Sequence, residues 1–424
     1  MCTLRKNNDM TELEQTLQNT IETILPADPA AISKATQRQA DLAKPPGSLG
    51  ILEEIAIRIA GMTGSVINEI DRGCVAVFCA DNGVVAEDVS SAPQSVTMAQ
   101  TVNFTRRLTG VGALAECFGS ELLIVDMGVK DGIPRELYLS EPFENDDTRK
   151  ILDRRIRPET GETDNIASGP AMTRDEALRC IAAGIEVADA IHAKGFDMMG
   201  VGEMGIGNTT TSAALLSAIT GEDAETTVGR GGGVNDEGFL RKKEIVSKVS
   251  AGYRKQGGIL KQRGVFGQTK GFLMDPDGAP SEEERLRMQR EQMLQALTEM
   301  GGFDICAMAG AYLGAAANRM PVVIDGYISV VAALVACVLA PAAKDYMIAS
   351  HKSFERGYEL AVETLGLKPF LSLDMRLGEG SGCPVAFEVI KGACSVMANM
   401  ATFEEAAIND GYLEEIRSKK EFQR

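Results

Sequence analysis

The run Gly73-Cys74-Val75-Ala76-Val77-Phe78-Cys79-Ala80 is followed at once by Asp81-Asn82-Gly83, and this stretch decides the fold. Eight consecutive residues without a charge, and without polar alternation, are typical of a parallel strand that is buried on both faces. In open α/β sheets, the polar residues that follow such strands lie at the edge where ligands bind. Asp81 and Asn82 therefore mark the expected binding edge of a parallel sheet.

Other apolar segments repeat this arrangement along the chain. Strands are predicted near 121–129, 196–204 and 321–326, and segments with helical spacing of apolar residues separate them. This alternation predicts a doubly wound α/β fold, in which a mostly parallel sheet lies between two layers of helices. Acidic residues stand at or just past the strand ends, so one acidic ligand crevice is expected there: Asp81, Asp126, Glu203, Asp325 and Glu379.

The two ends of the chain predict a small helical lobe. Helical spacing covers 11–24, 30–43 and 52–62, and polar helix is expected after Glu404. We therefore predict an N-terminal helical lobe over 1–70, the α/β domain over 71–382, and C-terminal helices over 383–424 that complete the lobe. Residues 134–162 are charged and poorly periodic, which predicts a surface excursion. Lys44, beside the rigid Pro45-Pro46-Gly47, either belongs to a plain linker or reaches a ligand.

Composition excludes several classes of partner. The 424 residues carry 43 Lys and Arg against 60 Asp and Glu, a net charge of −17, which disfavours nucleic acid and anionic membranes. The longest apolar run, 327–343, is shorter than the ~20 residues of a membrane span, so a buried helix is expected there. Nine cysteines without a C-x-x-C pair, and no signal peptide, predict reduced thiols in a cytoplasmic protein. Two histidines argue against a His-based metal site, and no metal is expected.

A glycine-rich turn holds the strongest candidate for a catalytic group. Met375-Arg376-Leu377-Gly378-Glu379-Gly380-Ser381-Gly382 precedes an apolar helix with Pro384 near its start. Glycines let the backbone approach a ligand closely, and a half-desolvated Glu379 with a raised pKa could act as a general base. The alternative is an ordinary turn whose glutamate faces water.

A second glycine-rich segment has two interpretations. Gly200, Gly202 and Gly205 match G-x-G-x-x-G after a short strand and before a helix expected over 212–219. One interpretation is a phosphate on a helix N-terminus. The other is a dinucleotide site in an oxidoreductase, which requires an acid some ~20 residues further on, after a second strand. Glu222 and Asp223 lie near that distance, but no second strand precedes them.

Taken together, these segments resemble the nicotinate-nucleotide–dimethylbenzimidazole phosphoribosyltransferase family over nearly the whole chain. The likeness rests on segments that occur in the same order as in the family: Lys44 to Gly50, Cys79 to Gly83, Gly200 to Thr210, Gly301 to Asp304, Asp325 to Tyr327, Ser350-His351, Arg376 to Gly382 and Asn399 to Glu404. The resemblance implies transfer of the phosphoribosyl group of nicotinate mononucleotide to 5,6-dimethylbenzimidazole or an analogue. The products would be the α-riboside 5′-phosphate and nicotinate, in cobalamin biosynthesis, without a metal or other cofactor.

The resemblance also assigns roles to individual residues. Glu379 matches the proton acceptor, and Glu203 matches a second acid near the ribose that is an alternative base. The other implied substrate-binding residues are Gly205, Gly207, Asn208, Lys242 and Ser353 for the phosphate, Gln100, Leu377 and Ala92 for the base, and Asp304 and Asp325 as acids around the site.

Three alternatives stay open on the sequence. Asn82 and Ala92 depart from the family pattern, which leaves open the accepted base and with it a phenol- or p-cresol-activating enzyme that works with a paralogous subunit. The family is generally a homodimer, so the chain is expected to form a homodimer or a heterodimer with a paralogue. A nucleotide-binding oxidoreductase and a non-catalytic partner subunit are the remaining interpretations.

Overall fold

A parallel sheet of seven strands forms the centre of the computed structural model, which describes residues 11–260, 281–413 and 419. The strand order is β3-β4-β2-β1-β5-β6-β7, and every pair is parallel. The strands are β1 (Gly73–Ala80), β2 (Glu121–Gly128), β3 (Tyr138–Leu139), β4 (Ile151–Asp153), β5 (Met198–Met204), β6 (Val322–Ile324) and β7 (Met347–Ala349). The predicted α/β fold with a mostly parallel sheet is confirmed.

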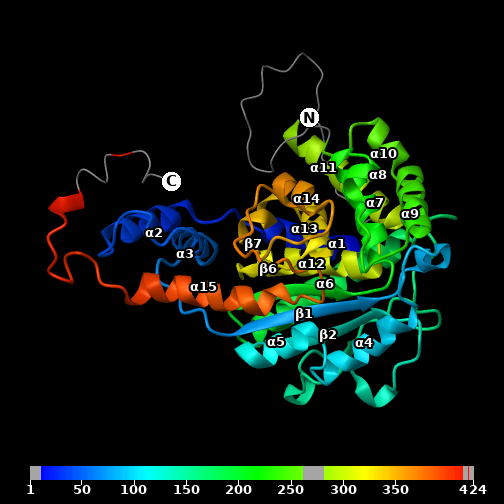
Figure 1. Ribbon diagram of the computed structural model, residues 1–424, viewed down its shortest axis with the longest axis horizontal. Coiled ribbons are helices and arrows are strands. Elements are labelled where there is room, and N and C mark those ends of the chain that lie inside the picture. The colour runs from blue at the N-terminus through cyan, green and yellow to red at the C-terminus, as the bar shows by residue number, and fades with distance from the viewer. Residues whose placement is uncertain (1–10, 261–280, 414–418, 420–424) are drawn as a thin grey trace, which may run out of the picture.

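Helices cover both faces of this sheet (Figure 1). In the view of Figure 1, α4 and α5 lie below β1 and β2, whereas α6, α12 and α13 lie above them. The helices are α1 (Glu12–Thr23), α2 (Pro29–Asp41), α3 (Ile51–Thr63), α4 (Ser95–Thr105), α5 (Gly110–Phe118), α6 (Arg174–Ala193), α7 (Asn208–Thr220), α8 (Ala224–Thr227), α9 (Asp236–Val249), α10 (Ala251–Lys255), α11 (Glu282–Met300), α12 (Phe303–Ala317), α13 (Tyr327–Leu339), α14 (Tyr358–Leu365) and α15 (Gly382–Asn399).

Strand β1 is the central strand, and its position determines where a ligand can bind. All eight of its residues are buried, as the apolar run predicts, and it pairs with β2 on one side and β5 on the other. The chain extends the sheet outward through β2 and β4, then returns to β5 on the opposite side of β1 and continues through β6 and β7. The order therefore reverses between β1 and β5, where doubly wound sheets open a crevice at the carboxyl ends of the strands.

The segment 134–162 is not the surface excursion that its charge predicts. It contains β3 and β4, which pair with each other and extend the sheet beyond β2. Ile151 and Leu152 are fully buried in β4. Two apolar residues between charged neighbours give too short a pattern to identify a strand, because their pairing depends on β2, which is far away in the sequence.

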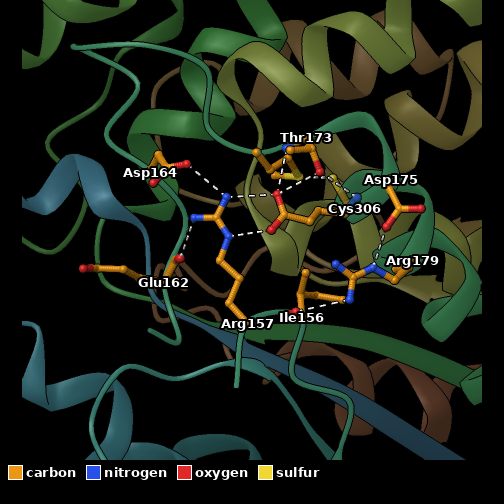
Figure 2. Close-up of polar contacts among 10 residues, drawn as sticks. Ile156, Arg157, Glu162, Asp164, Thr173, Asp175, Arg179 and Cys306 are labelled. Atoms are coloured by element: carbon orange, nitrogen blue, oxygen red, sulfur yellow. Dashed lines mark hydrogen bonds and ion pairs between the residues drawn. The ribbon is translucent and has the colours of Figure 1, made fainter. Parts of the chain in front are cut away.

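Arg157 anchors the chain that follows β4 (Figure 2). Its guanidinium donates to both carboxylate oxygens of Glu176, at 2.6 and 2.9 Å, and to Asp164 at 3.0 Å. Glu176 belongs to the capping box of α6, in which Thr173 is the N-cap. Thr163, beside this anchor, accepts a hydrogen bond from the Gly83 amide through its hydroxyl (3.1 Å). The anchored segment thus supports the loop that leaves β1.

We expect Glu176→Gln to lower the free energy of unfolding by about 2 kcal/mol at pH 7, because it leaves Arg157 without its main partner. Hydrogen bonds from Arg157 lower the pKa of Glu176 from 4.5 to about 2. A lowered pKa contributes stability above the ordinary pKa, and this contribution is lost as the pH falls through the folded-state value. The difference between wild type and variant, measured by urea unfolding, should therefore shrink between pH 4.5 and 2. A difference that is constant over this range would contradict the ion pair.

The helices near the ends of the chain make two different sets of contacts. Helices α2 and α3 pack together and α3 packs on α15, whereas α1 packs on α6 and α12. Lys44 forms an ion pair with Glu53 at 2.8 Å and is buried, so it stabilises the turn before α3. The division at 70 and 382 stays a prediction.

Two further expectations about local structure have clear outcomes. The expected helix after Glu404 is wrong for the described residues, since 404–407 form turns, 408–410 have no regular structure and only Gly411–Leu413 make a 3-10 turn. The apolar run from Tyr327 forms the fully buried helix α13, and among the described residues no helix is long and apolar enough to cross a membrane.

Candidate active site

A cavity of about 270 Å³ opens at the carboxyl ends of the strands. Its walls come from the end of β5, the N-termini of α7 and α13, the segment after β7 and the turn before α15. The lining residues include Val96, Gln100, Glu203, Gly205, Ile206, Asn208, Thr209, Gly231, Gly232, Asp325, Tyr327, Ser329, His351, Ser353, Arg376, Leu377 and Glu379. Of the five acidic residues predicted at this edge, Glu203, Asp325 and Glu379 line the cavity, whereas Asp81 and Asp126 do not and instead accept from backbone amides.

The turn that carries Glu379 has an unusual backbone. Gly378, Glu379 and Gly380 all have positive φ angles, of 84°, 64° and 84°. Glycine adopts this region freely, but glutamate does so at a cost in free energy, and such residues concentrate at functional sites. The turn also lies directly against β5, because a Cβ added at Gly202 would come within 2.6 Å of the Gly380 nitrogen.

The Glu379 carboxylate lies at the N-terminus of α5. Its Oε2 accepts a hydrogen bond from the Val111 amide at 3.2 Å, and its Oε1 accepts one from the Gln100 side chain at 3.4 Å. Burial raises the pKa of Glu379, while the amides of Val111 and Gly110 oppose this rise. A desolvated carboxylate that lines the cavity and is held in place by a helix N-terminus has the properties of a general base.

Three more carboxyl groups surround Glu379. Burial raises the pKa of Glu203 to about 8, that of Asp325 to about 7 and that of Asp304 to about 6, and the charges of neighbouring carboxylates reinforce the shift of Glu203. Among the described residues that line the cavity, Arg376 is the only lysine or arginine. The interior of the cavity therefore favours a ligand that carries positive charge next to these groups.

Most of the predicted site residues line this cavity, but four do not. Asp304 lies just behind the wall: a Cβ added at Gly205 would come within 3.1 Å of its Oδ2. Gly207, with φ 96°, is the N-cap of α7 and packs against Val85. Lys242 is fully buried and donates to the Thr209 hydroxyl at 2.7 Å. Ala92 is absent from the described cavity wall, and its amide donates to the Ser90 hydroxyl.

The glycines of the G-x-G-x-x-G segment serve packing. A Cβ at Gly200 would lie 2.6 Å from Cβ of Cys383, on α15, and Gly202 lies against the Glu379 turn. Other atoms of the protein thus occupy the space that a side chain at Gly200 or Gly202 would need. Helix α7 begins at Asn208, four residues before the predicted start, and the Asn208 amide group donates to Glu203. Glu203 is thereby hydrogen-bonded to Asn208 of the protein itself. The dinucleotide interpretation would instead place a ribose or pyrophosphate at this position.

Several residues of the cavity wall are missed by the sequence patterns. The glycines around Gly231 and Gly232 predict only a flexible loop, and the apolar run from Tyr327, which includes Ser329, predicts only a buried helix. The available signal is position: Thr209 and Tyr327 stand in the first turn of helices that follow strands, where free amides collect.

Comparison with known proteins agrees with this geometry. Residues 24–266 and 282–408 match the model of a family described as phosphoribosyltransferase. The chain belongs to this family, and the resemblance inferred from its motifs is confirmed.

Individual relatives define the family more closely. The chain is 45% identical to the nicotinate-nucleotide–dimethylbenzimidazole phosphoribosyltransferase of Clostridium perfringens strain ATCC 13124, over 92% of this chain and 94% of that one. It is 40% identical to the enzyme of the same name from Clostridium tetani, over 95% and 98%. The crystal structure of CobT from Thermus thermophilus superposes with a TM-score of 0.75 at 36% identity, and the match covers 90% of this chain and all of that one.

Proposed function

We propose that this chain transfers the phosphoribosyl group of nicotinate mononucleotide to 5,6-dimethylbenzimidazole or a close analogue. The products are the α-riboside 5′-phosphate and nicotinate. The observation that carries the proposal is the Glu379 carboxylate, which lines the cavity at the switch point of the sheet and accepts from the Val111 amide. The names of the relatives supply the two substrates.

The chemistry of the reaction explains why one base suffices. The bond between the anomeric carbon and the pyridinium nitrogen breaks, and its electron pair neutralises the pyridinium, so nicotinate leaves without an acid. One ring nitrogen of the benzimidazole forms the new bond to the anomeric carbon. The other nitrogen must then lose its proton, and Glu379 accepts it.

The acidic surroundings favour this reaction electrostatically. Positive charge lies on the pyridinium in the substrate and on the ribose ring as the bond breaks. Carboxylates fixed in a desolvated cavity stabilise such charge without reorganisation. The Glu379 carboxylate is placed for this role, because it lines the cavity and the N-terminus of α5 favours its charged form.

Glu379 is favoured over Glu203 as the base. The Glu203 carboxylate accepts from Asn208 and lies against the turn, 2.5 Å from where a Cβ of Gly378 would be. With a pKa raised to about 8 by burial, Glu203 is mostly protonated at neutral pH. Glu379 instead accepts from the amide of a helix N-terminus, which favours its charged form.

The phosphate is proposed to bind at the N-terminus of α7. Thr209 in the first turn of α7, the loop Gly231-Gly232 and the Ser353 hydroxyl all line the cavity. Lys242 is fully buried behind Thr209, and burial lowers its pKa to about 8. Its ammonium group donates to Thr209, which lines the cavity, so its charge lies next to the proposed phosphate position.

The assay that tests the proposal uses the purified chain alone. Nicotinate mononucleotide is supplied with dimethylbenzimidazole, adenine or p-cresol in parallel, and nicotinate and the riboside phosphate are followed by mass. We expect turnover with dimethylbenzimidazole, and equal turnover in a Gly392→Ala control, whose new Cβ would have no neighbour within 4 Å.

Other outcomes of this assay would replace the proposal. Turnover with p-cresol alone would move the chain to the phenol-activating enzymes. Absence of turnover with all three bases would contradict an enzyme that works by itself and would favour a paired subunit. The homodimer and the cytoplasmic location remain predictions of the same proposal.

A further inference from the structure

The strained turn around Glu379 needs an external support, and one side chain supplies it. Asp325 follows β6, and its carboxylate accepts hydrogen bonds from two amides of the turn. Oδ2 accepts from Gly380 at 3.1 Å, and Oδ1 accepts from Gly382 at 2.7 Å. These hydrogen bonds hold the backbone immediately after Glu379, on both sides of Ser381.

Asp325 is itself firmly placed. Its amide donates to the Ser329 hydroxyl at 3.1 Å, and its carbonyl accepts from the Ser350 hydroxyl at 3.1 Å. The side chain is almost fully buried, and among the described residues no lysine or arginine forms an ion pair with it. His351 Nδ1 lies 3.7 Å away, and burial lowers the pKa of that imidazole to about 4, so it is neutral near pH 7. The Asp325 carboxylate is therefore directed at the amides of the turn.

The glycine at 382 reflects the same contact. A Cβ at Gly382 would come closest to His351 Nδ1, and it would lie 2.8 Å from Asp325 Oδ1 and 2.9 Å from the Ser350 hydroxyl. Its backbone is helical and does not require glycine for its φ angle. The close approach of His351, Asp325 and Ser350 together therefore explains why glycine stands at this position.

We propose that Asp325 is a positioning residue, whose carboxylate holds the Gly380 and Gly382 amides and so fixes the left-handed turn that aims Glu379 into the cavity. The resemblance to the family places Asp325 among the substrate-binding residues, whereas its contacts assign it to the turn. The expected effect on turnover rests on the proposed function of Glu379, but the role of Asp325 in holding the turn does not.

A double-mutant cycle tests the link to Glu379. Asn at 325 can accept from only one of the two amides, so Asp325→Asn should lower kcat by about 30-fold and leave KM for nicotinate mononucleotide within about threefold. In a Glu379→Gln background the same change should lower the residual turnover by less than about twofold, because it acts through Glu379. Equal effects in both backgrounds, or a rise in KM with kcat unchanged, would overturn the proposal.

Hydrogen exchange gives a readout that does not depend on activity. The Gly380 and Gly382 amides should exchange at least about tenfold faster in Asp325→Asn. They should be unchanged in Asp304→Asn, which removes a buried carboxyl group that accepts from its neighbour Ile305. Unchanged exchange of these two amides in Asp325→Asn would overturn the proposal that Asp325 holds the turn. If the wild type shows no turnover but the two amides exchange faster in Asp325→Asn, the proposed function has failed, while the role of Asp325 in holding the turn is supported.

A second variant covers the case in which Asp325→Asn does not fold. Gly382→Ala keeps the carboxylate, but its methyl group would displace Asp325 from the turn together with His351 and Ser350. It should give the same pattern of lowered kcat, steady KM and faster exchange at Gly380. Normal kcat and normal exchange in Gly382→Ala would overturn the proposal.

Discussion

Glu379→Gln is expected to lower kcat by about 10²- to 10⁴-fold, with KM for nicotinate mononucleotide changed by less than about threefold. Glutamine has the shape of glutamate and can still accept from the Val111 amide, so the turn should persist. It cannot accept a proton, however, and the benzimidazole would keep its second proton as the new bond forms. Steady-state release of nicotinate measures the effect.

The pH dependence of the wild type should point to the same group. Burial raises the pKa of Glu379 above its ordinary value of 4.5. The base works only when ionised, so kcat/KM should fall as the pH drops through this raised pKa. Glu379→Gln should lose this acidic limb, whereas a variant that is merely less stable would keep it.

Glu203→Gln is the matched control for this prediction. Because burial and neighbouring carboxylates raise the pKa of Glu203 to about 8, its carboxyl is mostly neutral at pH 7, and glutamine reproduces that state. We expect kcat to stay within about tenfold of wild type. If Glu203→Gln is the severe variant and Glu379→Gln the mild one, then the roles of the two residues are exchanged.

The sequence predicts most of the elements that position this site, because their patterns are local. The buried run of β1 and the acids at strand ends each follow from a few adjacent residues. Strands β3 and β4 could not be predicted, because two or three residues become a strand only through pairing, here of β4 with β2 and of β3 with β4.

The site itself was predictable in its residues but less so in its geometry. Glu379 could be singled out from the glycines around it, yet its own left-handed φ angle depends on contacts with Asp325 and Gly202. Those contacts join segments more than fifty residues apart, which no local pattern reports. The same holds for Lys242, whose place behind Thr209 follows from the packing of α9 on α7.

The packing of α6 on α12 should be the feature of the fold most sensitive to one added methyl group. Gly184 on α6 faces α12, and a Cβ there would lie 2.7 Å from the Ala311 nitrogen. Gly310 on α12 faces α6, and a Cβ there would lie 2.8 Å from the Ile181 carbonyl carbon. The obstacles are backbone atoms of buried helices, which cannot rotate away as a side chain would, so the two helices would have to separate.

We therefore expect Gly310→Ala to lower the free energy of unfolding by about 3 kcal/mol or more, at the upper end of the cost of overpacking. Thermal and urea unfolding would measure the loss. Gly392→Ala makes the same chemical change in helix α15, where a Cβ meets nothing within 4 Å, and should stabilise by about 0.5–1 kcal/mol. Helix propensity favours alanine at both positions, so only the contact between α6 and α12 can make the two effects opposite in sign. Equal shifts in the two variants would mean that these helices lie further apart than their backbones indicate.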